Sequence, residues 1–305
     1  MPDRAEQLRQ GHELATLAFT NGEGSPPLLR PHLAAYPEVP LSYSALAEYR
    51  ACPSRFFAKR VLRLDDPNSG ESRNRIQLDP GLAPAEPVDP TAFGLAVHAQ
   101  LEQLPGRRWR PPTDQGIAGI LEGEGVEPTA ETLGLARSMI DGFLGSELAA
   151  ELEGHRADPE VRLLVDVDGV IIRGFADLLV RDLETPMILD YKTNRLDGKD
   201  PRELMEEYDL QRDLYALAVS EALGAARVET VFAFLRAPAD PVRDRFDAER
   251  LAEARTGISR LVEAITQGRY FGGPDAVHQP CGGCWACDLL RDRIGDIPDR
   301  EDSPR

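Results

Sequence analysis

The chain has 305 residues, of which 42% are hydrophobic and 29% are charged, and its formal net charge is −17 at pH 7. These values are ordinary for a globular protein with a hydrophobic core, and no apolar run approaches the roughly 20 residues that a membrane-spanning helix needs. The acidic balance argues mildly against a nucleic-acid partner, because phosphate groups normally bind to a basic patch. A local basic groove would escape that argument, and two clusters are candidates for one, although a solvated surface explains each as well: Arg55, Lys59 and Arg60, and Arg107, Arg108 and Arg110.

The N-terminal segment does not have the basic-then-apolar order of a signal peptide, so we expect a cytoplasmic protein. Residues 1–40 turn rich in proline and glycine, which predicts a flexible leader or linker. We expect the structured domain to cover residues 41–287. A densely charged tail that frays is expected over residues 288–305.

Helices dominate the first part of the expected domain. A helix should begin near residue 41, where Ser42 or Ser44 can cap it, and Pro53 should kink or restart it. Loop composition and helical periodicity then predict, in order, a loop over 64–90, a helix over 91–104, a loop with room for a short helix over 105–127, and a helix over 129–153.

The chain then changes to strands and helices in alternation. Asp168 and Gly169 stand between two apolar runs, residues 161–167 and 170–180, and this dipeptide is a strong signal for a β-hairpin turn. Further elements are expected as a strand over 186–193, a helix over 202–223 that ends at Gly224, strands over 228–236 and 241–246, and a helix over 247–267. This order indicates an α/β fold with a central mixed sheet flanked by helices. The sequence contains no GxxxxGK[ST] loop, so it carries no ATP motor of that type.

The triplet Asp190-Tyr191-Lys192 is the first candidate for chemistry. Side chains alternate along a strand, so Asp190 and Lys192 should share one face and Tyr191 the other. A carboxylate beside an ammonium suits metal-assisted hydrolysis, because the carboxylate can hold Mg²⁺ while the lysine orients water and offsets developing phosphate charge. Asp177, on the neighbouring strand, is a candidate second ligand. On its own, such a triplet is more often a surface ion pair than an active site.

Other motifs accompany the triplet in a fixed order. They are LSYSALAEYRACPSRFF, FGLAVHAQLE, GFADLLV, ILDYKT and QRDLY, followed by clustered cysteines. Over residues 41–287 this order resembles the RecB-like branch of the PD-(D/E)XK nucleases, which includes nuclease domains of AddAB-type helicase–nucleases. The resemblance implies a restriction-endonuclease-like core.

The resemblance also implies roles for single residues. His98, Asp177 and Asp190 match the ligands of a Mg²⁺ or Mn²⁺ ion. Lys192 matches the catalytic lysine, and the carbonyl of Tyr191 would complete the metal shell.

Three further residues match positions outside the metal shell. Gln211 and Tyr215 match a Q-x-x-x-Y motif, and as residues i and i+4 they share one helix face that can reach the DNA or the edge of the active site. Glu160 stands where relatives often carry an acidic residue.

The cysteines form a second candidate site. Cys281, Cys284 and Cys287 have ferredoxin-like local spacing, and Cys52 can supply a fourth ligand. Disulfides are disfavoured in a reducing cytoplasm. The resemblance implies a structural [4Fe–4S] cluster that staples the N- and C-terminal parts, but the family usually spaces the last ligands as C-x2-C-x5-C. Structural zinc on the same thiolates, with His278 as a substitute ligand, and unligated thiols stay open as alternatives.

Three hypotheses follow for function. The leading one is a metal-dependent DNA nuclease, an exonuclease or end-processing enzyme on single strands, acting in recombination or repair with a helicase partner. The second is a catalytically inactive, nuclease-like module that binds DNA or scaffolds a helicase. The third is a zinc-stapled binding protein.

Overall fold

The computed structural model describes residues 41–66, 89–272 and 276–294. The expected leader, most of the loop over 64–90 and the end of the expected tail lie outside these residues. The chain forms two compact units. One contains residues 41–47 and the described residues between 65 and 260; we call it the sheet unit. The other contains Glu48–Leu64 and the described residues from Leu261 onward; we call it the cysteine unit.

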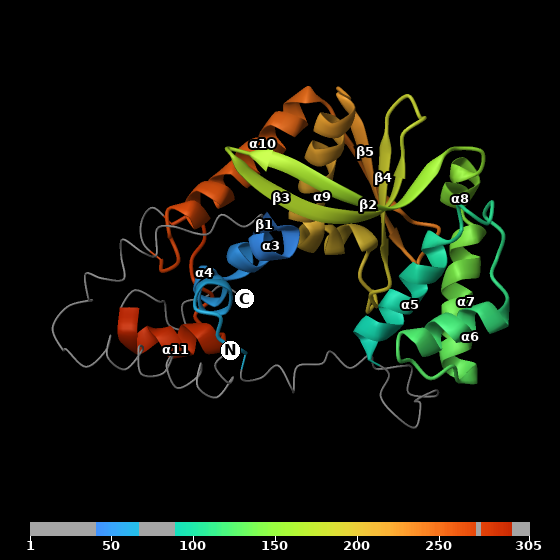
Figure 1. Ribbon diagram of the computed structural model, residues 1–305, viewed down its shortest axis with the longest axis horizontal. Helices are drawn as coiled ribbons and strands as arrows, with labels where there is room; N and C mark the ends of the chain where they lie inside the picture. The colour runs from blue at the N-terminus through green and yellow to red at the C-terminus, as the bar shows by residue number, and fades with distance from the viewer. Residues whose placement is uncertain (1–40, 67–88, 273–275, 295–305) are drawn as a thin grey trace, which may run out of the picture. The chain divides into compact units, whose positions relative to one another are not determined.

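A six-stranded mixed sheet is the centre of the sheet unit (Figure 1). Its strands are β1 (Leu41–Ser42), β2 (Ala157–Val167), β3 (Val170–Val180), β4 (Met187–Lys192), β5 (Val228–Phe234) and β6 (Val242–Phe246). The order is β1-β3-β4-β5-β6, with β2 also paired to β3. The β1–β3 and β4–β5 pairs are parallel, and the others are antiparallel. The predicted α/β fold with a mixed sheet is confirmed, and both of the last two predicted strands are present.

The β2–β3 hairpin turns at the predicted dipeptide. Asp168 and Gly169 have φ values of 54° and 80°, and left-handed conformations at both positions match the twist of the strands that they join. Only glycine adopts this conformation without steric cost, and aspartate is among the residues that tolerate it best.

The edge of β3 away from β2 is divided between two partners. β1 pairs with Ile172 and Arg173, and β4 pairs with Leu178, Leu179 and Val180. Neither register includes residues 174–177. The backbone along this stretch of β3 is therefore open to side-chain contacts, and the candidate site lies beside it.

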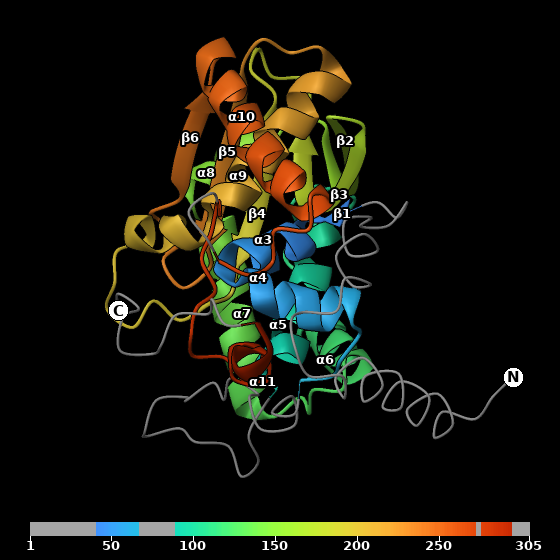
Figure 2. The ribbon, with the colours of Figure 1, turned by 90° about the vertical axis from the view of Figure 1, so that its left-hand side faces the viewer.

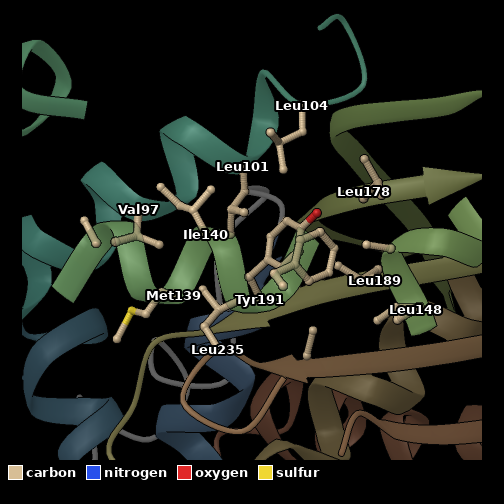
Figure 3. Packing of buried hydrophobic residues seen from close by; sticks show 14 of the residues in the cluster. Val97, Leu101, Leu104, Met139, Ile140, Leu148, Leu178, Leu189, Tyr191 and Leu235 are labelled. Carbon is tan, nitrogen blue, oxygen red and sulfur yellow. The ribbon is translucent and has the colours of Figure 1, made fainter. Parts of the chain in front are cut away.

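Four helices stand between residue 89 and the hairpin: α5 (Pro90–Glu102), α6 (Asp114–Gly123), α7 (Ala130–Leu144) and α8 (Glu147–Leu152). The first three pack against one another (Figure 2). Their apolar faces enclose one core with the side chains on one face of β4 and β5. Figure 3 shows Leu189 and Tyr191 of β4 in this core beside Leu101 and Ile140.

The single helix predicted over 129–153 is wrong. The chain forms two helices, because the turn at Gly145 and Ser146 ends α7 and starts α8. The Ser146 hydroxyl accepts the backbone N–H of Ala149, as an N-cap does.

Helix α9 (Pro201–Leu223) contacts the sheet on β2, β4, β5 and β6. Its residues Leu204 and Met205 pack with Phe232 and Phe234 of β5. Gly224 ends the helix as predicted, with a φ of 62°. Helix α10 (Ala248–Thr266) follows β6.

The cysteine unit holds the remaining elements, α4 (Pro53–Phe56), the π-helix η1 (Phe57–Val61) and α11 (Trp285–Ile294), while α3 (Tyr43–Ala51) begins in the sheet unit. Pro53 starts a new helix after the break at Cys52, as predicted. The fraying expected from residue 288 is wrong up to Ile294, since α11 covers it. No helix among the described residues combines the length and the apolar character that crossing a bilayer requires.

Candidate active site and cysteine centre

Asp177 lies on β3, in the interval that the strand registers leave open. Its Oδ2 accepts the backbone N–H of Tyr191 on β4 at 2.7 Å. The carboxylate thus replaces a backbone partner where the two strands part. It also fixes Asp177 against the predicted triplet.

Asp190 is 5% exposed and fully engaged in polar contacts. Its Oδ2 lies 2.7 Å from Nζ of Lys192, and its Oδ1 accepts Nε2 of Gln211 at 2.8 Å. The hydroxyl of Tyr215 lies 3.1 Å from the same Oδ1. Burial raises the pKa of Asp190, while the charge of Lys192 opposes that rise and the charge of Asp177 adds to it. The contacts place Asp190 and Lys192 on one face and bury Tyr191 on the other, as alternation predicts.

Lys192 is held from three sides. Its Nζ lies 2.9 Å from Oε1 of Gln211 and 4.1 Å from the centroid of the Tyr208 ring, in addition to its contact with Asp190. Tyr208 was not among the site residues predicted from the sequence. Its position in the sequence pointed to the site, because Tyr208, Gln211 and Tyr215 stand at i, i+3 and i+7 on one face of α9. Burial raises the pKa of Tyr208 to about 12, which keeps its hydroxyl protonated.

His98, on α5, faces Asp177. Its Nδ1 lies 3.2 Å from Oδ1 of that carboxylate. Burial lowers the pKa of His98, but the hydrogen bond and the charge of Asp177 outweigh burial, so the net pKa is raised. Gly94 allows α5 to lie this close, since a Cβ there would stand 3.1 Å from Oγ1 of Thr193.

Two more carboxylates lie near this pair. Glu102 is four residues after His98, and its pKa is raised by burial first and then by the charges of Glu160 and Asp177. Glu102 was not predicted from the sequence, although its i, i+4 spacing from His98 places both side chains on one face of α5. Glu160 is exposed, and its backbone has a φ of 47°.

The carboxylates of these residues are the oxygen donors that Mg²⁺ and Mn²⁺ prefer, and the imidazole of His98 adds a nitrogen donor of the kind that transition metals accept. His98 and Asp177 are in contact, and Asp177 also accepts the backbone N–H of Tyr191, the residue after Asp190 on β4. Lys192 engages Oδ2 of Asp190, so a cation at that oxygen would compete with the ammonium group. The role of the Tyr191 carbonyl stays a prediction.

The two basic clusters differ in their surroundings. Glu48 pairs with Lys59 at 3.2 Å and with Arg60 at 2.8 Å, so this cluster is partly neutralised. The second cluster, Arg107, Arg108 and Arg110, is exposed on the turn after α5. Neither cluster belongs to the hydrogen-bonded set around Asp190.

The four cysteines come together in the cysteine unit. Sγ of Cys52 lies 3.8 Å from that of Cys284 and 3.5 Å from that of Cys287, and Cys287 lies 3.8 Å from Cys281 and 3.7 Å from Cys284. None is in a disulfide. Among the described residues they are the one group of three or more potential ligands whose atoms all lie within 4.8 Å of one another. That group does not include His278.

The thiols perturb one another strongly. Hydrogen bonds with Cys284 and Cys287 lower the pKa of Cys52 to about 3, whereas contact with Cys284 and Cys52 raises that of Cys287. The backbone N–H groups of Arg55 and Cys281 also point at Sγ of Cys52, each at 3.4 Å. A thiolate, the form that binds metal, is thus stabilised at Cys52.

Comparison with known proteins gives a consistent result. The family model of the PD-(D/E)XK nuclease superfamily matches residues 40–288. One subunit of an ATP-dependent helicase/nuclease from Streptococcus equi subsp. zooepidemicus (strain MGCS10565) is 29% identical over 162 residues, which are 49% of this chain and 13% of that protein. The protein of the same name from Desulforudis audaxviator (strain MP104C) is 30% identical over 173 residues, 50% of this chain and 14% of its own length.

The matched region is thus a small part of these relatives. Among solved structures, a protein of Eubacterium rectale described as a candidate exonuclease is 13% identical, with a TM-score of 0.48 and coverage of 89% of this chain and 94% of its own. The family match covers both the sheet unit's candidate site and the cysteines. The chain belongs to the PD-(D/E)XK nuclease superfamily.

Proposed function

We propose that the chain hydrolyses DNA phosphodiesters with the help of Mg²⁺ or Mn²⁺ at the site around Asp190. The observation that carries the proposal is the buried Asp190–Lys192 pair, with Nζ 2.7 Å from Oδ2. Removing two charged groups from water is costly, and the attraction within an ion pair adds little to the stability of a protein. A site that needs both groups at one place explains the arrangement.

Each residue then has a definite task. Asp177, Asp190 and His98 would hold the cation, which when bound activates water and offsets charge on the phosphate. Lys192 would orient the attacking water and stabilise the phosphate oxygens. Gln211 bridges both partners of the buried pair and keeps them at a fixed spacing.

The substrate and partner are part of the proposal. We propose single-stranded DNA or DNA ends as substrate and a role in recombination or repair. The relatives' names support pairing with a helicase, since each is called a helicase/nuclease subunit. The helicase itself would be a separate chain or region.

The test is cleavage of end-labelled single-stranded DNA by the purified chain with Mg²⁺ or Mn²⁺. Asp190→Asn should abolish cleavage, because the amide loses the charge that binds the cation. Asp114→Asn is the matched control, because Asp114 is 82% exposed at the start of α6 and should leave cleavage unchanged. A metal-loaded wild type that binds DNA but cuts nothing would favour the inactive module instead.

We also propose that the four cysteines hold a single zinc ion. Four thiolates about 2.3 Å from one tetrahedral zinc lie about 3.8 Å from each other. Four of the six sulfur pairs here are 3.5 to 3.8 Å apart, and all four sulfurs lie within 4.8 Å of one another. In a four-iron cluster each thiolate binds its own iron, so the sulfurs must stand further apart. The spacing therefore favours the zinc alternative over the [4Fe–4S] cluster that the family resemblance implied.

Metal analysis after anaerobic purification separates the two. We expect one zinc per chain and no absorption band at about 400 nm. A brown protein that contains iron and inorganic sulfide would contradict the zinc proposal. Its nuclease site could be intact in either case.

A further inference from the structure

The β2–β3 hairpin has one buried and one exposed face. Leu163, Val165, Ile172, Gly174 and Ala176 are buried, and Tyr215 of α9 lies against Gly174. The opposite face carries Arg162, Leu164, Asp166, Ile171, Arg173 and Phe175, all exposed. We call these six residues the hairpin face.

The hairpin face is unusually apolar for a solvated surface. Phe175 is 60% exposed and Leu164 57%, and Phe175 is the one aromatic side chain among the large exposed hydrophobic residues of the described chain. The pairing register sets Arg162 opposite Phe175, and the guanidinium lies 5.7 Å from the ring centroid. A ring flanked by a cation is a surface on which a nucleic-acid base can stack.

The charge of this face also points to an anionic partner. Within the described residues, neither Arg162 nor Arg173 takes part in an ion pair, although the whole chain has a net charge of −17. At the other end of the same hairpin, Arg156 and Arg181 both pair with Asp158. The acidic member of the face, Asp166, uses its carboxylate to accept the N–H of Gly169 at the turn.

The face continues into the candidate active site. Phe175 precedes Asp177 by two residues on β3, so the two side chains belong to the same face of the strand, about 7 Å apart. The Tyr215 hydroxyl bonds the carbonyl of Phe175 and also lies 3.1 Å from Asp190. A base stacked on Phe175 would therefore stand at a fixed position relative to the carboxylates.

We propose that the hairpin face binds single-stranded DNA next to the cleavage site, with a base stacked on Phe175 and phosphates at Arg162 and Arg173. Stacking requires an unpaired base, so the occupant is a single strand and not a duplex. This inference rests on the proposed function, which supplies the cleavage site beside the hairpin face, but the test of binding does not depend on cleavage.

The binding test measures the fluorescence anisotropy of fluorescein-labelled oligodeoxythymidine as the full chain is added, without Mg²⁺ or Mn²⁺. Phe175→Leu should weaken binding at least about fivefold, because it removes the ring and keeps an apolar side chain, whereas Phe175→Trp should bind as well as wild type. Arg162→Ala and Arg173→Ala should each make the dependence of log affinity on log salt less steep by about 0.7.

Two matched controls come from exposed positions elsewhere in the sheet unit. Leu223→Ala removes an apolar group that is 37% exposed at the end of α9, and Arg245→Ala removes a guanidinium that is 81% exposed on β6. Both should bind like wild type. Unchanged binding in Phe175→Leu, Arg162→Ala and Arg173→Ala would overturn the proposal, as would equal affinity for a duplex of the same length. So would loss of a self-associated state without loss of DNA binding, because the occupant would then be a second copy.

A cleavage arm separates this proposal from the nuclease proposal. With Mn²⁺, Phe175→Leu should lower kcat/KM on a long single strand by a larger factor than it lowers the hydrolysis of a small chromogenic phosphodiester, which does not reach the hairpin face. A wild type that binds through the hairpin face and cuts neither substrate would refute the hydrolysis and keep the face. A wild type that cuts both, with hairpin variants indistinguishable from it, would refute the face and keep the hydrolysis.

Discussion

A few side chains decide what the candidate site can do. Asp190 is buried, yet every oxygen of its carboxylate has a partner: Lys192 on one, Gln211 and Tyr215 on the other. Removing any partner would leave a buried polar group uncompensated. The site is thus held in place before any cation or DNA arrives.

Tyr208 should position Lys192 through its ring. The ammonium lies 4.1 Å from the ring centroid, and such contacts contribute roughly 0.5 to 2 kcal/mol. We expect Tyr208→Leu to lower kcat on single-stranded DNA by about 2- to 30-fold, because the ammonium would lose its fixed position. Steady-state cleavage at saturating Mn²⁺ measures this.

Tyr208→Phe is the control, since it keeps the ring and loses only the hydroxyl. Its kcat should equal that of wild type. If Tyr208→Phe and Tyr208→Leu fall equally, the hydroxyl and not the ring is what Lys192 needs.

At the residue scale, the sequence was informative where the regular spacing of side chains along a strand or a helix determines which of them share a face. Strand alternation was enough to place Asp190 and Lys192 together, and i, i+4 spacing was enough for Gln211 and Tyr215. Tyr208 and Glu102 share helix faces with Gln211 and His98, but spacing alone does not separate them from other residues of those faces, because their importance comes from the long-range approach of α9 to β4 and of α5 to β3. A tyrosine or glutamate on a helix face is otherwise ordinary.

The elements position these residues through their ends and edges. One stretch of the β3 edge pairs with β1 and another pairs with β4, and the site lies beside the stretch between them. The Asp168-Gly169 turn was predictable because only a few residue types adopt two successive left-handed conformations. The break at Gly145 and Ser146 was not, because the apolar periodicity continues across it.

Ser146 should be the residue that fixes this break. Ser146→Ala should lower the free energy of unfolding by about 1 kcal/mol, because the N–H of Ala149 would lose its cap. Urea unfolding followed by circular dichroism measures the change. Ser146→Thr keeps a hydroxyl that can accept the Ala149 N–H and donate to the Phe143 carbonyl, so it should stay within a few tenths of a kcal/mol of wild type. A loss as large as that of alanine would mean that the stabilisation does not come from this hydroxyl.

On the scale of the whole molecule, the cysteines join segments that are far apart in the chain. Cys52 follows α3, whereas the other three stand just before or within α11. The sequence predicted this grouping from ligand spacing. The family resemblance implied a [4Fe–4S] cluster and the short last spacing left zinc open, because the separation of the sulfurs is a property of the folded chain.

Removal of the cysteine-bound metal should loosen the cysteine unit. Chelation, or Cys287→Ser, should raise hydrogen–deuterium exchange across Glu48–Leu64 and α11, because the thiolates would no longer be joined through an ion. Exchange in β4 and β5 should change far less. Equal protection with and without metal would show that packing alone holds the unit together.

The central claim is that Asp177 and Asp190 bind the cation while Lys192 assists the reaction, and a single-turnover Mn²⁺ titration tests it most directly. The rate of cleavage of end-labelled single-stranded DNA would be measured for wild type, Asp177→Asn and Lys192→Met. We predict that Asp177→Asn needs more Mn²⁺ for half-maximal rate, since an amide still accepts the Tyr191 N–H but binds the cation weakly. Lys192→Met should lower the maximal rate without needing more Mn²⁺, because Oδ2 of Asp190 is released from the ammonium. Full-rate cleavage by Lys192→Met, or cleavage by wild type that persists in excess chelator, would contradict the account.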